Sequence, residues 1–303
     1  EAALGANVRS TPGNAQRRPS GARQRLKRSI FVVCPPRSGS SLLFETLAQA
    51  PGLYTIGGES HGVIEGIASL SPARRQWASN RLLASDADRE TARKLAAAFL
   101  ERAHDRDGHA PPASGPLRLL EKTPKNALRV PFLAEAFPNA MFVYLYRDPR
   151  ETISSMLDAW RSGRFVTYPG LPGWTGLPWS LLLVPGWQHL RGRELAEIVA
   201  LQWAACVEIL LDDMQKLPPH RWCVADYAQL VQSPQDEIER LCGFLRLPWD
   251  RQLVAPLPLS RYTLKEPNPD KWKTNAQDLE IALPLIEKTA ARARELFAQV
   301  PVG

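Results

Sequence analysis

The sequence has no long hydrophobic run, and this absence excludes a membrane-spanning helix. None of its apolar stretches approaches the roughly 18 residues that such a helix needs, and the one at 181–184 ends at a proline. Charged residues make up 23% of the 303 residues and hydrophobic ones 44%, so we expect a large folded core rather than a disordered chain.

Cysteine and histidine are also scarce. The four cysteines form no C-x-x-C pair, and none has the spacing to a histidine that a zinc site requires. We therefore expect reduced thiols in the core of a cytoplasmic protein, and no metal site.

The body of the chain has little excess charge of either sign. The net charge is +7, but residues 1–28 contain seven arginines or lysines and a single acid, Glu1. The rest is close to neutral, which argues against a nucleic-acid partner. We expect residues 1–28 to form a basic disordered tail or linker, and an arginine-rich start is also typical of a transit peptide. Because the sequence begins without methionine, it fits a processed chain or one domain of a larger multidomain protein.

Short apolar runs alternate with helical patterns along residues 29–303. Buried strands are predicted at 30–34, 117–120, 141–145 and 221–224. Helices are predicted at 42–50, 72–107, 151–160, 194–214, 234–244 and 275–299. This alternation indicates an α/β protein with a P-loop-like three-layer fold, in which helices flank a central parallel β-sheet. The loops after residues 34, 120 and 145 should then meet at the carboxyl ends of the strands, where ligands bind.

The segment after the first predicted strand has the form of a phosphate-binding loop. It reads Cys34-Pro-Pro-Arg-Ser-Gly-Ser-Ser41. A glycine lets the backbone approach an anion, successive N–H groups at a helix N-terminus point at it, and Arg37 adds a planar fork of donors. An ordinary strand–helix turn with an exposed arginine is the alternative. The segment is not a Walker loop, because the basic residue precedes the glycine.

Pro36-Arg-Ser-Gly-Ser-Ser-Leu42 resembles the 5′-phosphosulfate loop of sulfotransferases that use 3′-phosphoadenosine-5′-phosphosulfate (PAPS). The bacterial and tyrosylprotein branches are similar in placing arginine at this position. The resemblance implies that residues 29–303 form a sulfotransferase domain. It also implies which residues hold the 5′-phosphate and sulfate, namely Arg37, Ser38, Gly39, Ser40 and Ser41.

A second segment, Tyr144–Ser155, resembles the 3′-phosphate motif of the same family. In that motif an arginine at a strand end is followed eight positions later by a serine, and Arg147 and Ser155 fit it. The two can converge on one phosphate, because Arg147 leaves the strand and Ser155 lies inside the next helix. A further arginine of the motif falls at Ala159 in this sequence, and Arg161 is the nearest substitute.

Two further segments resemble the parts of the family that carry the chemistry. Gly57-Gly-Glu-Ser60 is similar to a Gly-Glu-Glu-Thr-like segment, which assigns Glu59 as the general base, with His61 as the alternative. Glu121-Lys-Thr-Pro124 is similar to a Glu-Lys-[Ser/Thr]-Pro element. By that match Lys122 stabilises negative charge on the oxygen that bridges phosphate and sulfate. A helix-cap neighbour and a solvated lysine are the structural alternatives.

The remaining matches concern the nucleotide. Asp226-Tyr-Ala-Gln-Leu-Val231 resembles an element whose tyrosine contacts the nucleotide, so Tyr227 is a candidate. Residues 260–273 resemble a C-terminal loop that closes over the nucleotide. Within it two choices stay open, Ser260 or Thr263 beside the bridging oxygen and Lys271 or Lys273 at the 3′-phosphate.

The resemblance therefore implies in-line transfer of a sulfuryl group from PAPS to a hydroxyl, with release of 3′,5′-adenosine bisphosphate. An ATP-dependent small-molecule kinase is one alternative, and a non-catalytic nucleotide-binding module is another. The acceptor is expected to be a small molecule, a lipid or a carrier-tethered chain. Its walls are expected at 63–107 and in the insert at 163–189, whose tryptophans should pack by burial.

Overall fold

The computed structural model describes residues 21–264, 268 and 270–299. Its centre is a five-stranded sheet with the order β2-β3-β1-β4-β7, and every neighbouring pair is parallel. The strands are β1 (Ile30–Val33), β2 (Leu53–Tyr54), β3 (Arg118–Lys122), β4 (Met141–Tyr146) and β7 (Trp222–Asp226). The predicted parallel α/β fold is confirmed. Only the short edge strand β2 is a strand of this sheet that the sequence did not indicate.

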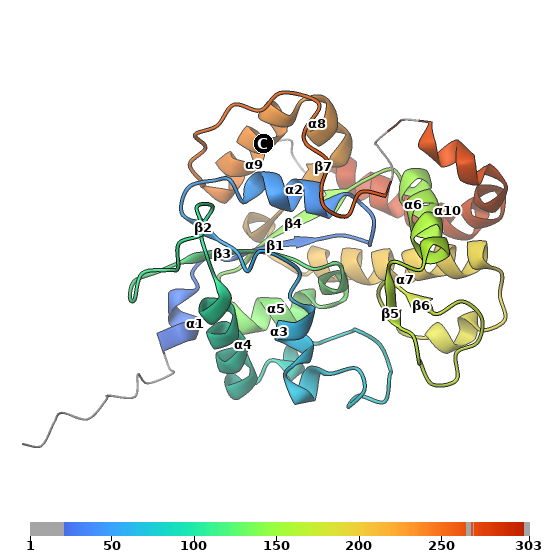
Figure 1. Cartoon of the computed structure of the whole chain (residues 1–303), viewed down its shortest axis with the longest axis horizontal. Coiled ribbons are helices and arrows are strands. Elements are labelled where there is room, and N and C mark those ends of the chain that lie inside the picture. The colour runs from blue at the N-terminus through green and yellow to red at the C-terminus, as the bar shows by residue number, and fades with distance from the viewer. Residues whose placement is uncertain (1–20, 265–267, 269, 300–303) are drawn as a thin grey trace, which may run out of the picture.

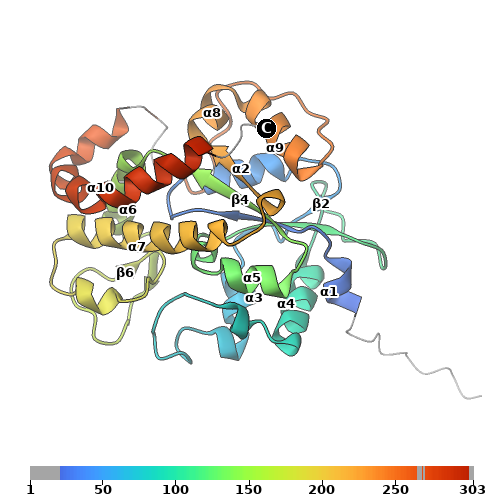
Figure 2. The same ribbon diagram turned by 180° about the vertical axis from the view of Figure 1, so that it is seen from behind.

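Helices cover both faces of the sheet, because successive side chains of a strand point to opposite sides. Ile30 and Val32 of β1 belong to a core shared with the helices α2, α8 and α9. Phe31 and Val33 belong to the larger core on the other face, shared with α4, α5 and α7. Figure 1 shows these two helical layers above and below the strands, and Figure 2 shows them from behind. The three-layer prediction is therefore confirmed.

The remaining elements surround this centre. The α-helices are α1 (Gly21–Arg25), α2 (Ser40–Leu47), α3 (His61–Glu65), α4 (Arg89–Arg102), α5 (Val130–Ala136), α6 (Pro149–Ser162), α7 (Leu195–Gln215), α8 (Tyr227–Gln232), α9 (Pro234–Leu245) and α10 (Ala276–Gln299). Short 3₁₀ helices lie at Ala68–Leu70, Ala84–Asp86, Pro124–Leu128, Trp187–Leu190, Pro219–Arg221 and Lys271–Asn275. A separate antiparallel pair joins β5 (Val166–Tyr168) to β6 (Trp179–Ser180).

The expectation of a mainly helical segment at 72–107 is wrong for its first half. The α-helix α4 starts only at Arg89, where the Asp88 carboxylate accepts hydrogen bonds from the backbone N–H groups of Glu90 and Thr91. Upstream, Gln76 and Trp77 both have positive φ angles, which a right-handed helix does not tolerate. Alanine-rich composition alone does not reveal such backbone breaks.

The basic tail predicted to reach residue 28 does not include residues 21–28. These residues form α1 and then run beside β3, where Leu26 is buried and pairs with Leu117. The Arg23 guanidinium donates to the backbone carbonyl of Ala136 at 2.8 Å. Arginines that sequence composition assigns to a solvated tail are thus used to cap neighbouring backbone. Residues 1–20 lie outside the described residues.

The tryptophan-rich insert packs by aromatic burial, as expected. Trp160, Trp174, Trp179 and Trp187 form one cluster with edge-on and tilted rings whose centroids lie 4.8 to 6.4 Å apart. Gln202 of α7 accepts from the Trp160 indole and donates to two backbone carbonyls of the insert. This network holds β5 and β6 against α6 and α7.

Within the described residues, no helix combines the length and the apolar character that crossing a bilayer demands. The four cysteines, Cys34, Cys206, Cys223 and Cys242, are all buried and none forms a disulfide, as the sequence predicted. Burial raises the thiol pKa of all four, so they are unreactive core side chains.

Candidate active site

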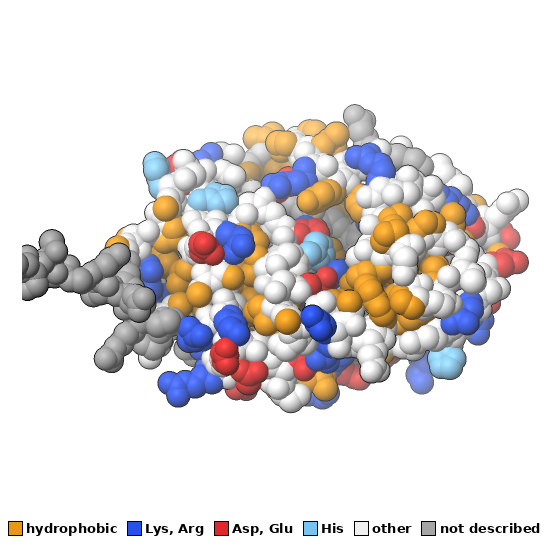
Figure 3. Space-filling view, turned by 60° about the horizontal axis from the view of Figure 1, so that its bottom comes forward, with side chains coloured by type: hydrophobic (Ala, Val, Ile, Leu, Met, Phe, Trp, Pro, Cys, Tyr) orange, Lys and Arg blue, Asp and Glu red, His pale blue; other side chains and the backbone are white. Residues whose placement is uncertain are grey.

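A cavity of about 510 Å³ lies at the carboxyl ends of the parallel strands. The carboxyl ends of β1, β3, β4 and β7, with the residues just beyond them, contribute Arg37, Lys122, Arg147 and Tyr227 to its lining. This is the edge of a parallel sheet at which ligands are expected. Figure 3 shows a hollow near the centre of one face, with charged and histidine side chains along it and hydrophobic ones on both sides.

The loop after β1 is shaped around Gly39. This glycine has a φ angle of 92° and precedes the first residue of α2, so the N-terminal N–H groups of that helix face the cavity. A Cβ atom at this position would lie 2.2 Å from the Tyr227 ring. The Ser38 hydroxyl donates to the carbonyl of Pro35 at 2.8 Å and braces the turn. These features fit a loop that cradles phosphate or sulfate.

Arg147 and Ser155 converge with Arg37, as the sequence pattern requires. The Arg37 Nε donates to the Ser155 hydroxyl at 3.3 Å, and the Arg147 Nη1 donates to the Arg37 carbonyl at 3.1 Å. Arg147 also stacks on the Tyr227 ring, 4.2 Å from its centroid. Burial, followed by the charge of Arg147, lowers the pKa of Arg37 to about 10. The positive charges of two guanidinium groups this close repel each other, and a bound anion offsets that repulsion.

Lys122 and Glu59 lie in direct contact next to this anion site. The Lys122 Nζ donates to the Glu59 Oε1 at 2.6 Å and to the Ser41 hydroxyl at 3.1 Å. The His61 Nε2 lies 2.6 Å from the other oxygen of Glu59. Burial by itself raises the pKa of Glu59, but the His61 hydrogen bond and Lys122 lower it more, to about 2. Lys122 is not a solvated surface lysine, since its side chain is only 3% exposed.

A buried network that the sequence did not indicate positions Glu59. Glu121 is buried, and its carboxylate accepts from the Ser60 hydroxyl at 2.6 Å and from the Asn126 amide at 2.6 Å. The backbone N–H of Ser60 donates to the Thr123 hydroxyl at 2.7 Å. The residue after Glu59 is therefore fixed to the end of β3, the strand that ends with Lys122.

The described residues of the C-terminal loop contribute to the cavity lining, and they separate one of the two pairs of candidates that the sequence left open. Ser260 and Thr263 both line the cavity, and their hydroxyls lie 3.1 Å apart. Lys271 also lines it. Lys273 instead pairs with Asp270 at 2.8 Å, is 59% exposed and does not line the cavity. Lys271 is thus the better placed of the two lysines.

Two aromatic contacts of the site were not foreseen. The Arg37 guanidinium lies 4.4 Å from the centroid of the Phe165 ring in the insert, and Lys122 lies 5.3 Å from that of Tyr262. The Tyr262 carbonyl also accepts from both terminal nitrogens of Arg37 at 3.2 Å. Nothing in the sequence pattern joins these segments, because the contacts depend on how distant loops fold over one another.

Arg161 does not take the place suggested for it. Its guanidinium donates to Asn275 at 2.7 Å and to Asp278 at 2.8 Å, and it is not part of the cavity lining. These contacts tie α6 to the start of α10. Ala159, at the position where the motif has its further arginine, is buried in α6 and supplies no cation.

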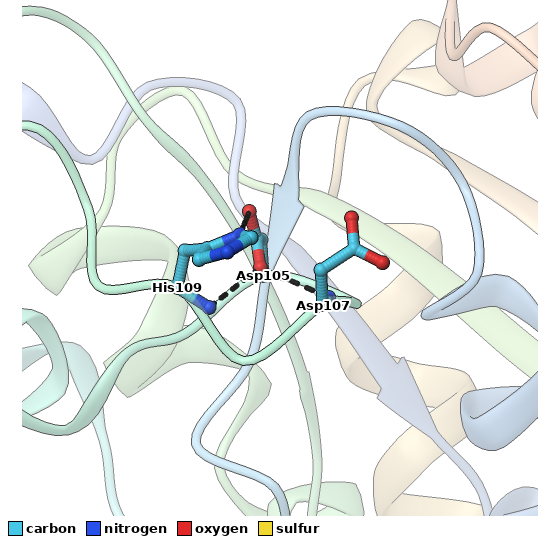
Figure 4. A group of neighbouring side chains, drawn as sticks. All are labelled: Asp105, Asp107 and His109. Carbon is cyan, nitrogen blue, oxygen red and sulfur yellow. Dashed lines mark hydrogen bonds and ion pairs between the residues drawn. The ribbon is translucent and has the colours of Figure 1, made fainter.

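A second polar cluster lies on a loop away from the cavity, where Asp105, Asp107 and His109 gather (Figure 4). The Asp105 carboxylate accepts from the backbone N–H groups of both other residues, at 3.0 and 2.8 Å. The Asp107 and His109 side chains are exposed. The cluster is explained as a turn closed by Asp105.

Fold and site together define an α/β protein in which Arg37 and Arg147 meet beside a glycine-containing loop at the edge of a parallel sheet. The chain belongs to the sulfotransferase family, because the model described as "Sulfotransferase family" matches residues 29–251.

Individual relatives agree with this family. The chain is 26% identical over 232 residues to protein-tyrosine sulfotransferase A of Caenorhabditis elegans, covering 74% of this chain and 51% of that protein. It is 24% identical over 226 residues to the protein-tyrosine sulfotransferase of Drosophila melanogaster, covering 73% and 38%. The chain thus spans less than two thirds of either relative.

Among solved structures, the sulfotransferase domain from the curacin biosynthetic pathway has a TM-score of 0.50 and 19% identity. The match covers 91% of this chain and 100% of that one, and it shows a common fold.

Proposed function

We propose that the protein transfers a sulfuryl group from PAPS to a hydroxyl acceptor. The observation that carries this proposal is the convergence of three motifs, distant in sequence, on one cavity. Arg37, Arg147 and Ser155 form a linked set at one end, and the Lys122–Glu59 pair adjoins it. Two anion sites flanked by a cation and a carboxylate suit a donor with two separated phosphates and a group to be transferred.

On the donor side, the loop after β1 holds the 5′-phosphate and the sulfate through Arg37, Ser38, Gly39, Ser40 and Ser41. The 3′-phosphate is held by Arg147 and Ser155, and Lys271 reaches it from the covering loop. Tyr227 contacts the nucleotide. The hydroxyls of Ser260 and Thr263 remain equivalent candidates beside the bridging oxygen, since both line the cavity.

In the transfer step the acceptor oxygen attacks sulfur while the bond from sulfur to the bridging phosphate oxygen breaks. The acceptor proton passes to Glu59, and the electron pair of the broken bond stays on 3′,5′-adenosine bisphosphate. Lys122 neutralises the charge that develops on the bridging oxygen. A carboxylate with a pKa of about 2 is a weak base. When the Lys122 ammonium moves to the donor, Glu59 loses that ion-pair partner. Its pKa then rises and it becomes a stronger base.

His61 is a partner of Glu59 rather than an independent base. Its Nε2 lies 2.6 Å from Glu59, so it orients the carboxylate. Residues 163–189 form the acceptor-side wall, because Phe165, Tyr168 and Leu182 of this insert line the cavity. The acceptor is a hydroxyl-bearing small molecule, a lipid or a carrier-tethered chain.

Nucleotide binding tests this proposal against the kinase and binding-module alternatives. Calorimetric titration should show tighter binding of 3′,5′-adenosine bisphosphate than of ATP–Mg²⁺. Tighter binding of ATP–Mg²⁺ would favour a kinase. Binding of the bisphosphate without any turnover of PAPS would favour a non-catalytic module.

A further inference from the structure

A buried polar cluster lies in the acceptor part of the cavity and takes no part in the proposed chemistry. It consists of Glu65, Asn80, Lys125, Arg129 and Tyr168, all but Glu65 buried. Glu65, Lys125 and Tyr168 line the cavity. The Lys125 Nζ donates to both Glu65 oxygens, at 2.8 and 3.0 Å, and to the Tyr168 hydroxyl at 2.8 Å. Burial of so many polar and charged groups costs free energy unless each donor and acceptor has a hydrogen-bond partner.

The Tyr168 hydroxyl has an unused hydrogen. Its oxygen accepts from Lys125 and, at 2.6 Å, from the Asn80 Nδ2. The Asn80 side-chain amide cannot be flipped, because its Oδ1 already accepts from the backbone N–H of Leu183 at 2.6 Å. Burial lowers the pKa of Lys125, and the paired Glu65 carboxylate offsets part of that effect. The short contacts of Nζ with both Glu65 oxygens are those of an ammonium, which only donates. Within the described ranges no acceptor is bonded to the Tyr168 hydrogen.

The hydroxyl keeps this hydrogen at neutral pH. Burial, followed by the charge of Glu65, raises the pKa of Tyr168. The residue is therefore a neutral donor that lines the cavity. A hydroxyl that accepts two hydrogen bonds and donates none leaves part of its capacity for a ligand.

The charges around Tyr168 favour an oxygen acceptor over a donor. Two cations, Lys125 and Arg129, face the single carboxylate of Glu65. The Arg129 Nη1 is buried and has no hydrogen-bond partner in the described part of the chain. The next carboxylate along the cavity, Glu59, is already paired with Lys122. The cluster thus has one positive charge in excess and two unused donors.

We propose that Tyr168 is a specificity residue for the acceptor: its hydroxyl donates a hydrogen bond to a carbonyl or carboxylate oxygen that the acceptor carries beyond its reacting hydroxyl. This inference rests on the proposed function, since it presumes that the hydroxyl lies near Glu59. Apolar side chains, among them Val166, Leu181 and Leu182, line the cavity as well. The acceptor is therefore an apolar chain or ring with a hydroxyl at one point and such an oxygen at another.

The test measures binding rather than turnover. The full chain is saturated with 3′,5′-adenosine bisphosphate and titrated calorimetrically with ω-hydroxyalkanoates of about three to ten methylenes, their methyl esters and the matched alkanols. We expect the acid or the ester to bind about tenfold or more tightly than the alkanol at one chain length. The acid and ester arms distinguish a charged from a neutral oxygen. Equal binding of all three at every length overturns the inference.

A matched pair of variants assigns the effect to Tyr168. Tyr168→Phe keeps the ring and should remove most of the preference while leaving alkanol binding unchanged. Tyr54→Phe removes a tyrosine hydroxyl that does not line the cavity and should keep the preference. A preference that survives in Tyr168→Phe overturns the assignment. The wild-type comparison needs no variant, so it decides the inference even if Tyr168→Phe does not fold. If the bisphosphate itself does not bind, the proposed function fails, which is a separate outcome.

Discussion

The ammonium of Lys122 lies 2.6 Å from the carboxylate of Glu59, and both groups line the same cavity. The contact joins the residue proposed to stabilise the leaving group to the residue proposed to take the acceptor proton. In this contact each group satisfies the other. The proposed transfer requires Lys122 to leave Glu59 for the bridging oxygen, so it couples donor binding to the strength of the base.

Replacement of Glu59 by glutamine separates catalysis from nucleotide binding. Turnover should fall by about 10²- to 10⁴-fold, because the amide cannot take a proton. The affinity for 3′,5′-adenosine bisphosphate should stay or rise, since Lys122 loses its ion-pair partner. Steady-state kinetics and calorimetry measure the two effects, and Glu90→Gln on the exposed face of α4 is the control. Unchanged turnover in Glu59→Gln would remove Glu59 from this role.

Replacement of Arg147 by methionine should affect only ligands with a 3′-phosphate. A hydrogen bond to a charged group contributes about 1.5–3 kcal/mol, so binding of 3′,5′-adenosine bisphosphate should weaken about 10- to 100-fold. Binding of 5′-AMP should change little. Arg150→Met, nearby in the first turn of α6 but 50% exposed and paired with Asp148, is the control. An equal loss for both nucleotides would contradict the assignment of Arg147 to the 3′-phosphate.

Replacement of Gly39 by alanine should damage the nucleotide loop. The added Cβ would meet the Tyr227 ring at 2.2 Å, and the φ angle of 92° is strained for any residue with a side chain. We expect a loss of about 1–3 kcal/mol in the free energy of unfolding and weak or no binding of the bisphosphate. Gly243→Ala, in α9 where the Cβ meets open space, should leave nucleotide binding unchanged and raise the free energy of unfolding by up to about 1 kcal/mol. Full binding in Gly39→Ala would show that the loop is not held as described.

The stability of the protein should depend on Glu59 in acid. Its pKa is depressed from 4.5 to about 2 in the folded state. A depressed carboxylate pKa stabilises the fold above the unfolded pKa, and this contribution is lost as the pH falls from about 4.5 towards 2. Urea unfolding at a series of pH values should therefore show Glu59→Gln less stable than wild type at pH 7, with the difference shrinking across that window. A constant difference would contradict the Lys122–Glu59 pairing.

The sequence could predict those parts of the site that lie in contiguous motifs. Arg37, Lys122 and Arg147 each lie at or just beyond the carboxyl end of a strand, and parallel strands bring these ends to one edge. The cluster around Tyr168 could not be predicted, because its members come from four separate segments that meet only through packing. The same limit applies to the contact between Arg37 and the Tyr262 carbonyl, which uses a backbone atom and leaves no trace in residue type.

The errors of prediction have local physical causes. Composition predicted a helix at 72–88. Positive φ angles at Gln76 and Trp77 interrupt this segment, and α4 begins only after the N-cap Asp88. Composition likewise predicted a solvated tail at 21–28, where Leu26 is buried and Arg23 bonds to the end of α5. In both segments tertiary contacts outweigh local propensity.

Transfer of isotope-labelled sulfur from PAPS, read by mass spectrometry over a panel of phenols, sugars, lipids, hydroxy acids and carrier-tethered acyl chains, tests the central claim most directly. We expect a labelled sulfate ester on at least one acceptor, equimolar release of 3′,5′-adenosine bisphosphate, and loss of both in Glu59→Gln. No labelled product from any acceptor, with the bisphosphate bound normally, would contradict it.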